Sequence, residues 1–222
     1  MYKRYDLPGA NAEAQPDWSI EFIPRAELIE VHRSFRVLKY PRIAGSWRPA
    51  FVGHLRSILK ALRRVHRRDV VHGDIRLHNM VFVPVSAGAS ATSTVSTASA
   101  AELDATPRTY EARLIDFDFA RPEGSAYPAR LDSVSDTQRH PDVRHHRAAM
   151  RKVHDCHSML FLLRQFRPCD ATLRAPYDEA VGALDVEDAE FLRAARRALK
   201  PLADASIEMT ERFAAVMAKY MK

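Results

Sequence analysis

The chain has 222 residues, of which 46% are hydrophobic and 28% are charged, a composition that supports a buried core and excludes a disordered or collagen-like chain. No apolar run approaches the length of a membrane span, no secretory signal follows the basic residues near the N-terminus, and two cysteines cannot build a disulfide framework. The formal net charge of +6, carried mainly by arginine, is compatible with nucleic acid, an anionic membrane surface or phosphorylated ligands, although most surface arginines are simply solvated. We therefore expect a soluble intracellular protein, cytoplasmic or nuclear, with no membrane partner.

The first part of the chain predicts two strands followed by a helix. Trp18–Ile23 and Phe35–Tyr40 alternate or run apolar, as strands do, whereas residues 1–17 show little periodicity and indicate an irregular lead-in. Pro41–Gly45 breaks the pattern and indicates a connector. From Gly53 to Arg68, leucine and isoleucine recur at helical spacing with arginines between them, which predicts an amphipathic helix.

The middle of the chain predicts short strands around a polar loop. Val70–Val71 and Met80–Val85 flank the loop, and Ala112–Ile115 forms a further strand. Residues 86–106, rich in alanine, serine and threonine, predict a flexible insert, because such a segment buries too little to offset its ordering entropy. Helical patterns follow an irregular, arginine- and histidine-rich stretch, at 152–167, 175–184, 187–203 and 205–220. Strands followed by helices indicate an α+β protein.

Two polar segments carry the residue types that phosphoryl transfer requires. His72–Asn79 (HGDIRLHN) separates a helix from an apolar strand, and Asp116–Asp118 (DFD) follows another strand. Phosphoryl transfer needs a carboxylate near the accepting hydroxyl, oxygen ligands for Mg²⁺ and positive charge on the transferred phosphate. Both segments supply carboxylates, and the first also supplies an amide and an arginine.

These segments resemble the motifs of the protein-kinase-like family. His72–Asn79 is similar to its catalytic loop, Asp116–Asp118 to its metal-binding Asp-Phe-Gly element, and Asp155–Leu163 (DCHSMLFLL) to its Asp-x-Trp-Ser helix. All three occur in the order of the family. The resemblance implies an α+β, protein-kinase-like fold with a mostly helical C-terminal lobe at 46–222, interrupted by the insert at 86–106, and a truncated N-terminal lobe remnant with its hinge at 1–45.

The resemblance also implies a role for each matching residue. Asp74 would be the catalytic base, and Arg76 would contact the transferring phosphate. Asn79 and Asp116 would be the ligands of Mg²⁺.

Supporting positions follow from the same resemblance. His72 would hold the catalytic loop against the segment of Asp116, and Asp155 would brace that loop from the helix. The adenine of ATP would meet the backbone of the hinge around Tyr40, Pro41 and Arg42.

The sequence departs from the family pattern at two motif positions. Gly73 stands where protein kinases usually have arginine, which argues against control by a phosphorylated activation loop. Asp118 replaces the glycine of Asp-Phe-Gly. Both changes are seen in small-molecule and atypical kinases, such as aminoglycoside- and choline-type phosphotransferases.

A larger departure lies before residue 50. Gly9 is the only glycine before Gly45, so the sequence has no Gly-rich loop over the phosphates. Lys39 superficially resembles the lysine that binds the α- and β-phosphates, but it precedes the helix at Gly53 too closely to leave room for the remaining N-lobe elements. Most of an N-lobe is therefore missing.

The resemblance implies that the chain, if it is an active enzyme, transfers a phosphoryl group from ATP, with Mg²⁺, to a hydroxyl group, most readily on a protein substrate. A pseudokinase or truncated C-lobe serving as a binding scaffold, and a small-molecule kinase, remain open alternatives. A partner could supply the missing N-lobe elements. We expect no nucleic acid partner, because the basic helix lacks interleaved aromatic residues, and no metal site at the histidines between 140 and 157, because they lack a clean ligand spacing.

Overall fold

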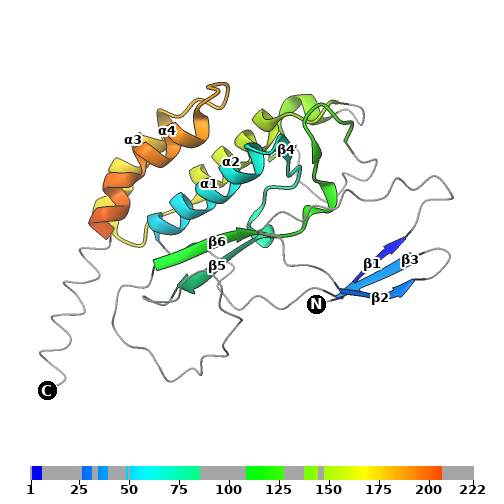
Figure 1. Ribbon diagram of the computed structural model, residues 1–222. Helices are drawn as coiled ribbons and strands as arrows, with labels where there is room; N and C mark the ends of the chain where they lie inside the picture. The colour runs from blue at the N-terminus through cyan, green and yellow to red at the C-terminus, as the bar shows by residue number, and fades with distance from the viewer. Residues whose placement is uncertain are drawn as a thin grey trace, which may run out of the picture. The chain divides into compact units, whose positions relative to one another are not determined.

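The structure is a computed structural model that describes residues 2–6, 27–31, 35–39, 49, 51–85, 109–127, 138–144 and 148–206 (Figure 1). The chain divides into two compact units, Met1–Ala44 and Gly45–Lys222. Several predicted features lie outside the described residues: the strand Trp18–Ile23, the hinge residues Tyr40, Pro41 and Arg42, the insert at 86–106 and most of the helix at 205–220.

The first unit contains a three-stranded antiparallel sheet in the order β1-β3-β2. Its strands are β1 (Tyr2–Asp6), β2 (Glu27–Val31) and β3 (Phe35–Lys39). The prediction of a strand at Phe35–Tyr40 is confirmed, but the irregular lead-in is wrong for Tyr2–Asp6, and β2 was not predicted. Strand β1 pairs with β3 along its length, and β2 pairs with β3 on both sides of a register shift between Leu28 and Glu30. Such pairing supplies backbone hydrogen bonds that need no apolar alternation in the strand itself.

The second unit begins with the amphipathic helix that the sequence predicts, α1 (Val52–His66). Its apolar residues recur at the spacing that places them on one face, and that face is buried. Helix α1 contacts β6, and Figure 1 shows it running over the strand pair β5–β6. The buried face consists of Val52, Leu55, Ile58, Leu59, Leu62 and Val65.

Two antiparallel strand pairs flank the polar loops. Strand β5 (Met80–Val85) pairs antiparallel with β6 (Thr109–Leu114), from Met80 opposite Leu114 to Val85 opposite Thr109. The predicted strands are confirmed in place, and β6 begins earlier than its apolar pattern because it pairs along the whole of β5. This register puts the segment before β5 beside the segment after β6. The short strands β4 (Val70–Val71) and β7 (Arg121–Pro122) pair in the same way.

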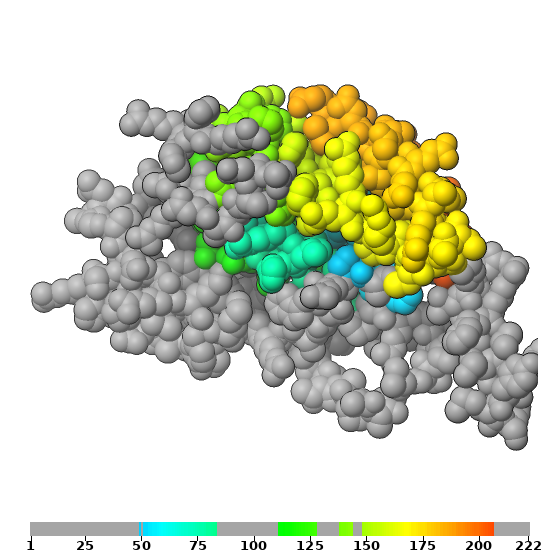
Figure 2. Space-filling model, turned by 180° about the vertical axis from the view of Figure 1, so that it is seen from behind, coloured from blue at the N-terminus to red at the C-terminus, as the bar shows by residue number. Residues whose placement is uncertain are grey.

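Helices form the rest of the unit. They are α2 (Lys152–Gln165), α3 (Arg174–Gly182) and α4 (Phe191–Ala198), with residues 200–206 also helical. Single 3-10 turns occur at η1 (Leu77–Asn79), η2 (Phe117–Phe119), η3 (Pro141–Arg144) and η4 (Ala171–Leu173). Figure 2 shows the later helices, coloured yellow to orange, gathered on one face of this unit.

The helix expected at 187–203 begins later than its pattern indicates. The Asp185 carboxylate accepts from the backbone N–H of Glu187 at 3.0 Å, and the Asp188 carboxylate accepts from that of Glu190 at 2.8 Å. Such local bonds favour turns over helix, so α4 starts at Phe191. Among the described residues, no helix has both the length and the apolar character needed to cross a bilayer.

Candidate functional site

The carboxylate of Asp155 in α2 holds the backbone of the loop that follows β4. One oxygen accepts from the backbone N–H of His72 at 2.8 Å and from His66 Nε2 at 2.9 Å, and the other accepts from the N–H of Gly73 at 2.9 Å. The side chain is 2% exposed. Burial opposes ionisation, but the hydrogen bond and charge of His66 outweigh it, so the pKa of Asp155 lies below its usual value. An ionised carboxylate therefore anchors two successive loop residues.

His72 links this loop to the segment that follows β6. Its ring is fully buried, Nε2 lies 3.1 Å from the carbonyl oxygen of Ile115, and the ring packs on Phe117 with centroids 4.6 Å apart. Because Nδ1 accepts from the backbone N–H of Asp74 at 3.3 Å, the proton is on Nε2, which donates to Ile115. Burial lowers the pKa of His72, in keeping with a neutral ring.

The carboxylate of Asp74 has one oxygen that accepts hydrogen bonds and one that has no partner among the described residues. Oδ2 accepts from Asn79 Nδ2 at 2.7 Å and from an Arg76 Nη at 2.9 Å, while the same Asn79 amide also donates to the Asp74 carbonyl at 2.9 Å. Oδ1 is buried and has no hydrogen-bond partner within the described part of the chain. Burial raises the pKa of Asp74, opposed by Arg76 and Asn79. The open oxygen is an oriented acceptor of the kind a substrate hydroxyl needs.

Asp116 follows β6 in the left-handed backbone conformation, with φ 64° and ψ 64°. Aspartate tolerates this region better than most residues, and here it turns the chain sharply from β6 into η2. The Ile115 N–H donates to the Asn79 carbonyl at 3.0 Å, so Asp116 and Asn79 stand at adjoining strand ends. The negative charge of Asp116 helps to raise the pKa of Asp74. The two carboxylates are therefore close enough to repel each other.

This donor set fits a divalent cation. Carboxylate and amide oxygens are the ligands that Mg²⁺ prefers, and Asp116 with the amide oxygen of Asn79 would supply them. A cation held there would also relieve the repulsion between Asp116 and Asp74.

The glycine that departs from the kinase pattern is required by the local geometry. Gly73 has φ 76°, a region that favours glycine. A Cβ atom there would lie 2.7 Å from the Cε of Met150 and 3.3 Å from the Cβ of Phe119. A side chain at this position would be strained by the positive φ, and the end of the Met150 side chain would have to shift to make room for it.

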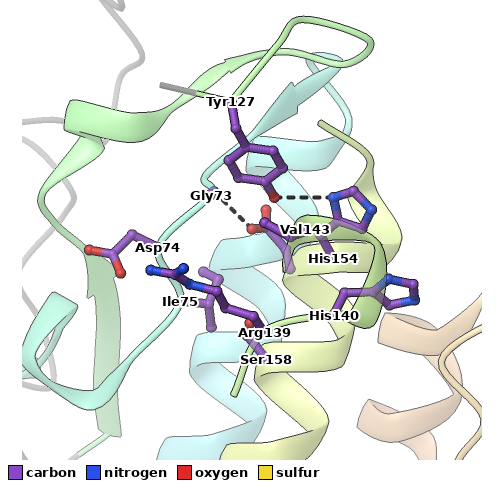
Figure 3. A pocket seen from close by; sticks show the side chains of 10 residues that line it. Gly73, Asp74, Ile75, Tyr127, Arg139, His140, Val143, His154 and Ser158 are labelled. Atoms are coloured by element: carbon purple, nitrogen blue, oxygen red, sulfur yellow. Dashed lines mark hydrogen bonds between the residues drawn. The ribbon is translucent and has the colours of Figure 1, made fainter. Parts of the chain in front are cut away.

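A further segment, which the motifs did not single out, lies against the loop. Gln138 Nε2 donates to the Ile75 carbonyl at 2.8 Å, and the Ser158 hydroxyl donates to the Gln138 carbonyl at 2.9 Å. These bonds place Arg139 beside Asp74 at a small cavity (Figure 3). The sequence assigned neither Gln138 nor Arg139 a role in the site, since both lie far from Asp74 along the chain.

The sequence-predicted residues thus divide into two groups. The structure brings together His72, Asp74, Arg76, Asn79, Asp116 and Asp155 at the ends of β4, β5, β6 and the start of α2. The hinge residues Tyr40, Pro41 and Arg42 lie outside the described residues.

Comparison with known proteins gives one kind of likeness. No protein-family model matches the sequence, and none of the curated proteins matches it either. The structure is similar to the crystal structure of the BubR1 kinase domain, with a TM-score of 0.53 and 14% sequence identity over 87% of this chain and 67% of that chain. At this identity the likeness concerns the fold alone: mixed helices and small sheets arranged like those of a kinase domain.

Proposed function

We propose that this chain is a phosphotransferase of the protein-kinase-like fold, which moves a phosphoryl group from ATP to a hydroxyl, most readily on a protein. The observation that carries the proposal is the carboxylate of Asp74. One oxygen is held by Asn79 and Arg76, and the other is buried and open among the described residues. An unpartnered buried carboxylate oxygen costs stability, and such sites are typical of function rather than of packing.

The geometry suits a base that accepts the proton of the substrate hydroxyl. The brace from Asp155 and the link through His72 hold the loop before a substrate arrives, so little ordering is left for the reaction step. Burial raises the pKa of Asp74 and so brings it closer to that of a useful base at neutral pH.

The residues next to Asp74 would bind Mg²⁺ and the phosphate groups of ATP. Asn79 and Asp116 would hold Mg²⁺, which when bound neutralises charge on the phosphates. Arg76 is 27% exposed at its side chain and bonded to Asp74, so its guanidinium can reach an entering phosphate while remaining near the carboxylate. The adenine site at Tyr40, Pro41 and Arg42, and a partner that supplies further N-lobe elements, belong to the same proposal.

A second candidate function is a binding scaffold without catalysis, and the absence of a Gly-rich loop in the sequence before Gly45 favours it. Positioning of the phosphates is most of kinase catalysis. A chain that lacks the elements that position the phosphates would keep the helical unit but lose catalytic turnover. The third candidate function is phosphorylation of a small molecule, since the histidine-glycine-aspartate loop occurs in small-molecule kinases.

Calorimetry of MgATP binding, together with a phosphate-transfer assay, separates the phosphotransferase from the binding scaffold. We expect wild type to bind MgATP and Asp116→Asn to lose binding, whereas Asp178→Asn, the same change at an exposed site on α3, binds as wild type does. Asp74→Asn should bind MgATP and fail to transfer phosphate to a protein or peptide acceptor. A well-folded wild type that binds no MgATP would overturn the enzyme and leave the scaffold.

A further inference from the structure

A cavity of about 20 Å³ adjoins the catalytic loop. It is lined by Asp74 and Ile75 of the loop, by Arg139, and by His154 and Ser158 of α2 (Figure 3). One water molecule needs roughly 10–15 Å³ by the same measure, so the cavity holds a single small polar group. Its walls show which kind of group.

Arg139 contributes a cation with an unused hydrogen-bond donor. Its Nη2 atom is buried, and it has no hydrogen-bond partner in the described part of the chain. Of the two carboxylates at the cavity, Asp155 accepts three hydrogen bonds and Oδ2 of Asp74 accepts two, whereas Oδ1 of Asp74 has no hydrogen-bond partner among the described residues. Figure 3 shows the Arg139 side chain extending toward Asp74. A buried guanidinium N–H is a strong donor that favours an anionic acceptor.

The position of Arg139 is set by its neighbour. Gln138 donates to the carbonyl of Ile75, the residue after Asp74, and accepts from Ser158 of α2. The backbone that bears Arg139 is therefore tied both to the loop and to the helix that braces it. This guanidinium is placed relative to Asp74 by hydrogen bonds rather than by chance at the surface.

The histidines beside the cavity also present donors. Ligand atoms of His140, Asp142 and His154 lie within 4.8 Å of one another, a spacing that suits a metal. However, Nδ1 of His154 accepts from the backbone N–H of Arg151 at 3.3 Å, and Nδ1 of His140 accepts from that of Asp142 at 3.2 Å. Both rings therefore carry their proton on Nε2 when neutral, and an N–H cannot ligate a metal.

His154 is consequently a second donor at the cavity. It is 3% exposed, and its Nε2 has no hydrogen-bond partner among the described residues. Burial, with the nearby charges of His140 and Arg151, lowers the pKa of His154 to about 4, so the ring is neutral at pH 7. Two donors without a partner among the described residues, Arg139 Nη2 and His154 Nε2, thus belong to residues that line the cavity together with Asp74.

We infer that this cavity is an oxyanion subsite, in which Arg139 binds one oxygen of a carboxylate or phosphate group, with the rest of that group outside the cavity and beside the hydroxyl that faces Asp74. The assignment to the acceptor rests on the proposed function, whereas the binding of an oxyanion does not. The preferred acceptor is then a molecule that carries an acidic group next to its hydroxyl, such as a serine flanked by aspartate. The same chemistry would also admit a free anion.

The first test measures anion binding without catalysis. Inorganic phosphate is titrated into the full chain at constant ionic strength, and the melting temperature is followed. We expect phosphate to raise the melting temperature of wild type and of Arg197→Gln, which makes the same charge change at an exposed site on α4. Arg139→Gln should lose the response, and Arg139→Lys should retain part of it. Equal responses of wild type and Arg139→Gln would overturn the subsite.

The second test identifies the source of the anion. Two acceptor peptides are compared, a serine flanked by aspartate and the same serine flanked by asparagine. We expect wild type to favour the acidic peptide in kcat/KM by about tenfold or more, the size expected of one hydrogen bond to a charged group, and Arg139→Gln to lose that ratio. Equal use of both peptides, with the phosphate response intact, would overturn the acceptor assignment and leave a free-anion site.

Failure of the proposed function gives a different pattern. If neither peptide is phosphorylated and MgATP does not bind, the phosphotransferase is wrong, while the phosphate titration still decides the subsite. Circular dichroism of Arg139→Gln and Arg139→Lys shows whether each variant is folded, so that a lost phosphate response can be told from lost folding. Arg139→Lys also serves as the control that keeps the positive charge.

Discussion

Replacing Asp155 by asparagine tests the brace on which the whole site depends. The carboxylate accepts three hydrogen bonds, from His66 and from the backbone of His72 and Gly73. An amide keeps one accepting oxygen and turns an NH₂ group toward at least one of these donors. Removing one partner of a buried charged network costs about 3–5 kcal/mol, and a hydrogen bond to a charged group contributes about 1.5–3 kcal/mol.

We therefore expect Asp155→Asn to lower the free energy of unfolding by about 3 kcal/mol or more. For a chain of this size that corresponds to a fall in melting temperature of about 6–12 °C. Urea unfolding followed by far-ultraviolet circular dichroism measures the difference. Asp178→Asn, exposed on α3, is the matched control and should stay within about 0.5 kcal/mol of wild type. A loss below about 1 kcal/mol for Asp155→Asn would refute the reasoning.

The same substitution has a pH signature. The folded pKa of Asp155 is depressed below its usual value, so its stabilising contribution is present above the unfolded pKa of about 3.9 and is lost as the pH falls through the folded pKa. The difference between wild type and Asp155→Asn should therefore be full at neutral pH and shrink in strong acid. A difference that stays constant over this range would mean that ionisation of Asp155 does not matter.

Two further substitutions test the loop itself. Gly73→Ala should destabilise the chain by about 1–3 kcal/mol, because φ is 76° and the new Cβ would meet Met150 at 2.7 Å; urea unfolding measures it, and an unchanged midpoint would show that the loop is free to shift. Asp74→Asn should abolish phosphoryl transfer yet raise stability at neutral pH, because burial raises the folded pKa of Asp74 and ionising it costs stability as the pH rises through that pKa. The gain in stability should vanish in acid, where Asp74 is protonated. A variant that is less stable than wild type at neutral pH would contradict the claim that ionised Asp74 destabilises the fold.

Local patterns in the sequence determined the elements whose own apolar residues form part of the core. Helix α1 follows its leucine and isoleucine spacing, and strands β5 and β6 follow their apolar runs. The polar segments at 72–79 and 116–118 were recognisable because their residue types are adjacent in the chain. Each of these signals lies within one short window.

Tertiary structure alone decided what depends on pairing between distant segments. Strand β1 (YKRYD) has no apolar alternation and forms only because β3 pairs with it. The register of β5 with β6 brings Asn79 beside Ile115 and Asp116, and no local pattern encodes a register between strands that the insert separates.

The site shows the same division. The sequence by itself predicted that Asp74, Asn79, Asp116 and Asp155 belong to one kind of chemistry, because a motif is a local arrangement of residue types. Only the tertiary structure showed that, among the described residues, Oδ1 of Asp74 and Nη2 of Arg139 have no hydrogen-bond partner. Whether a buried polar atom has a partner depends on every segment packed around it, and a linear sequence does not contain that information in any single window.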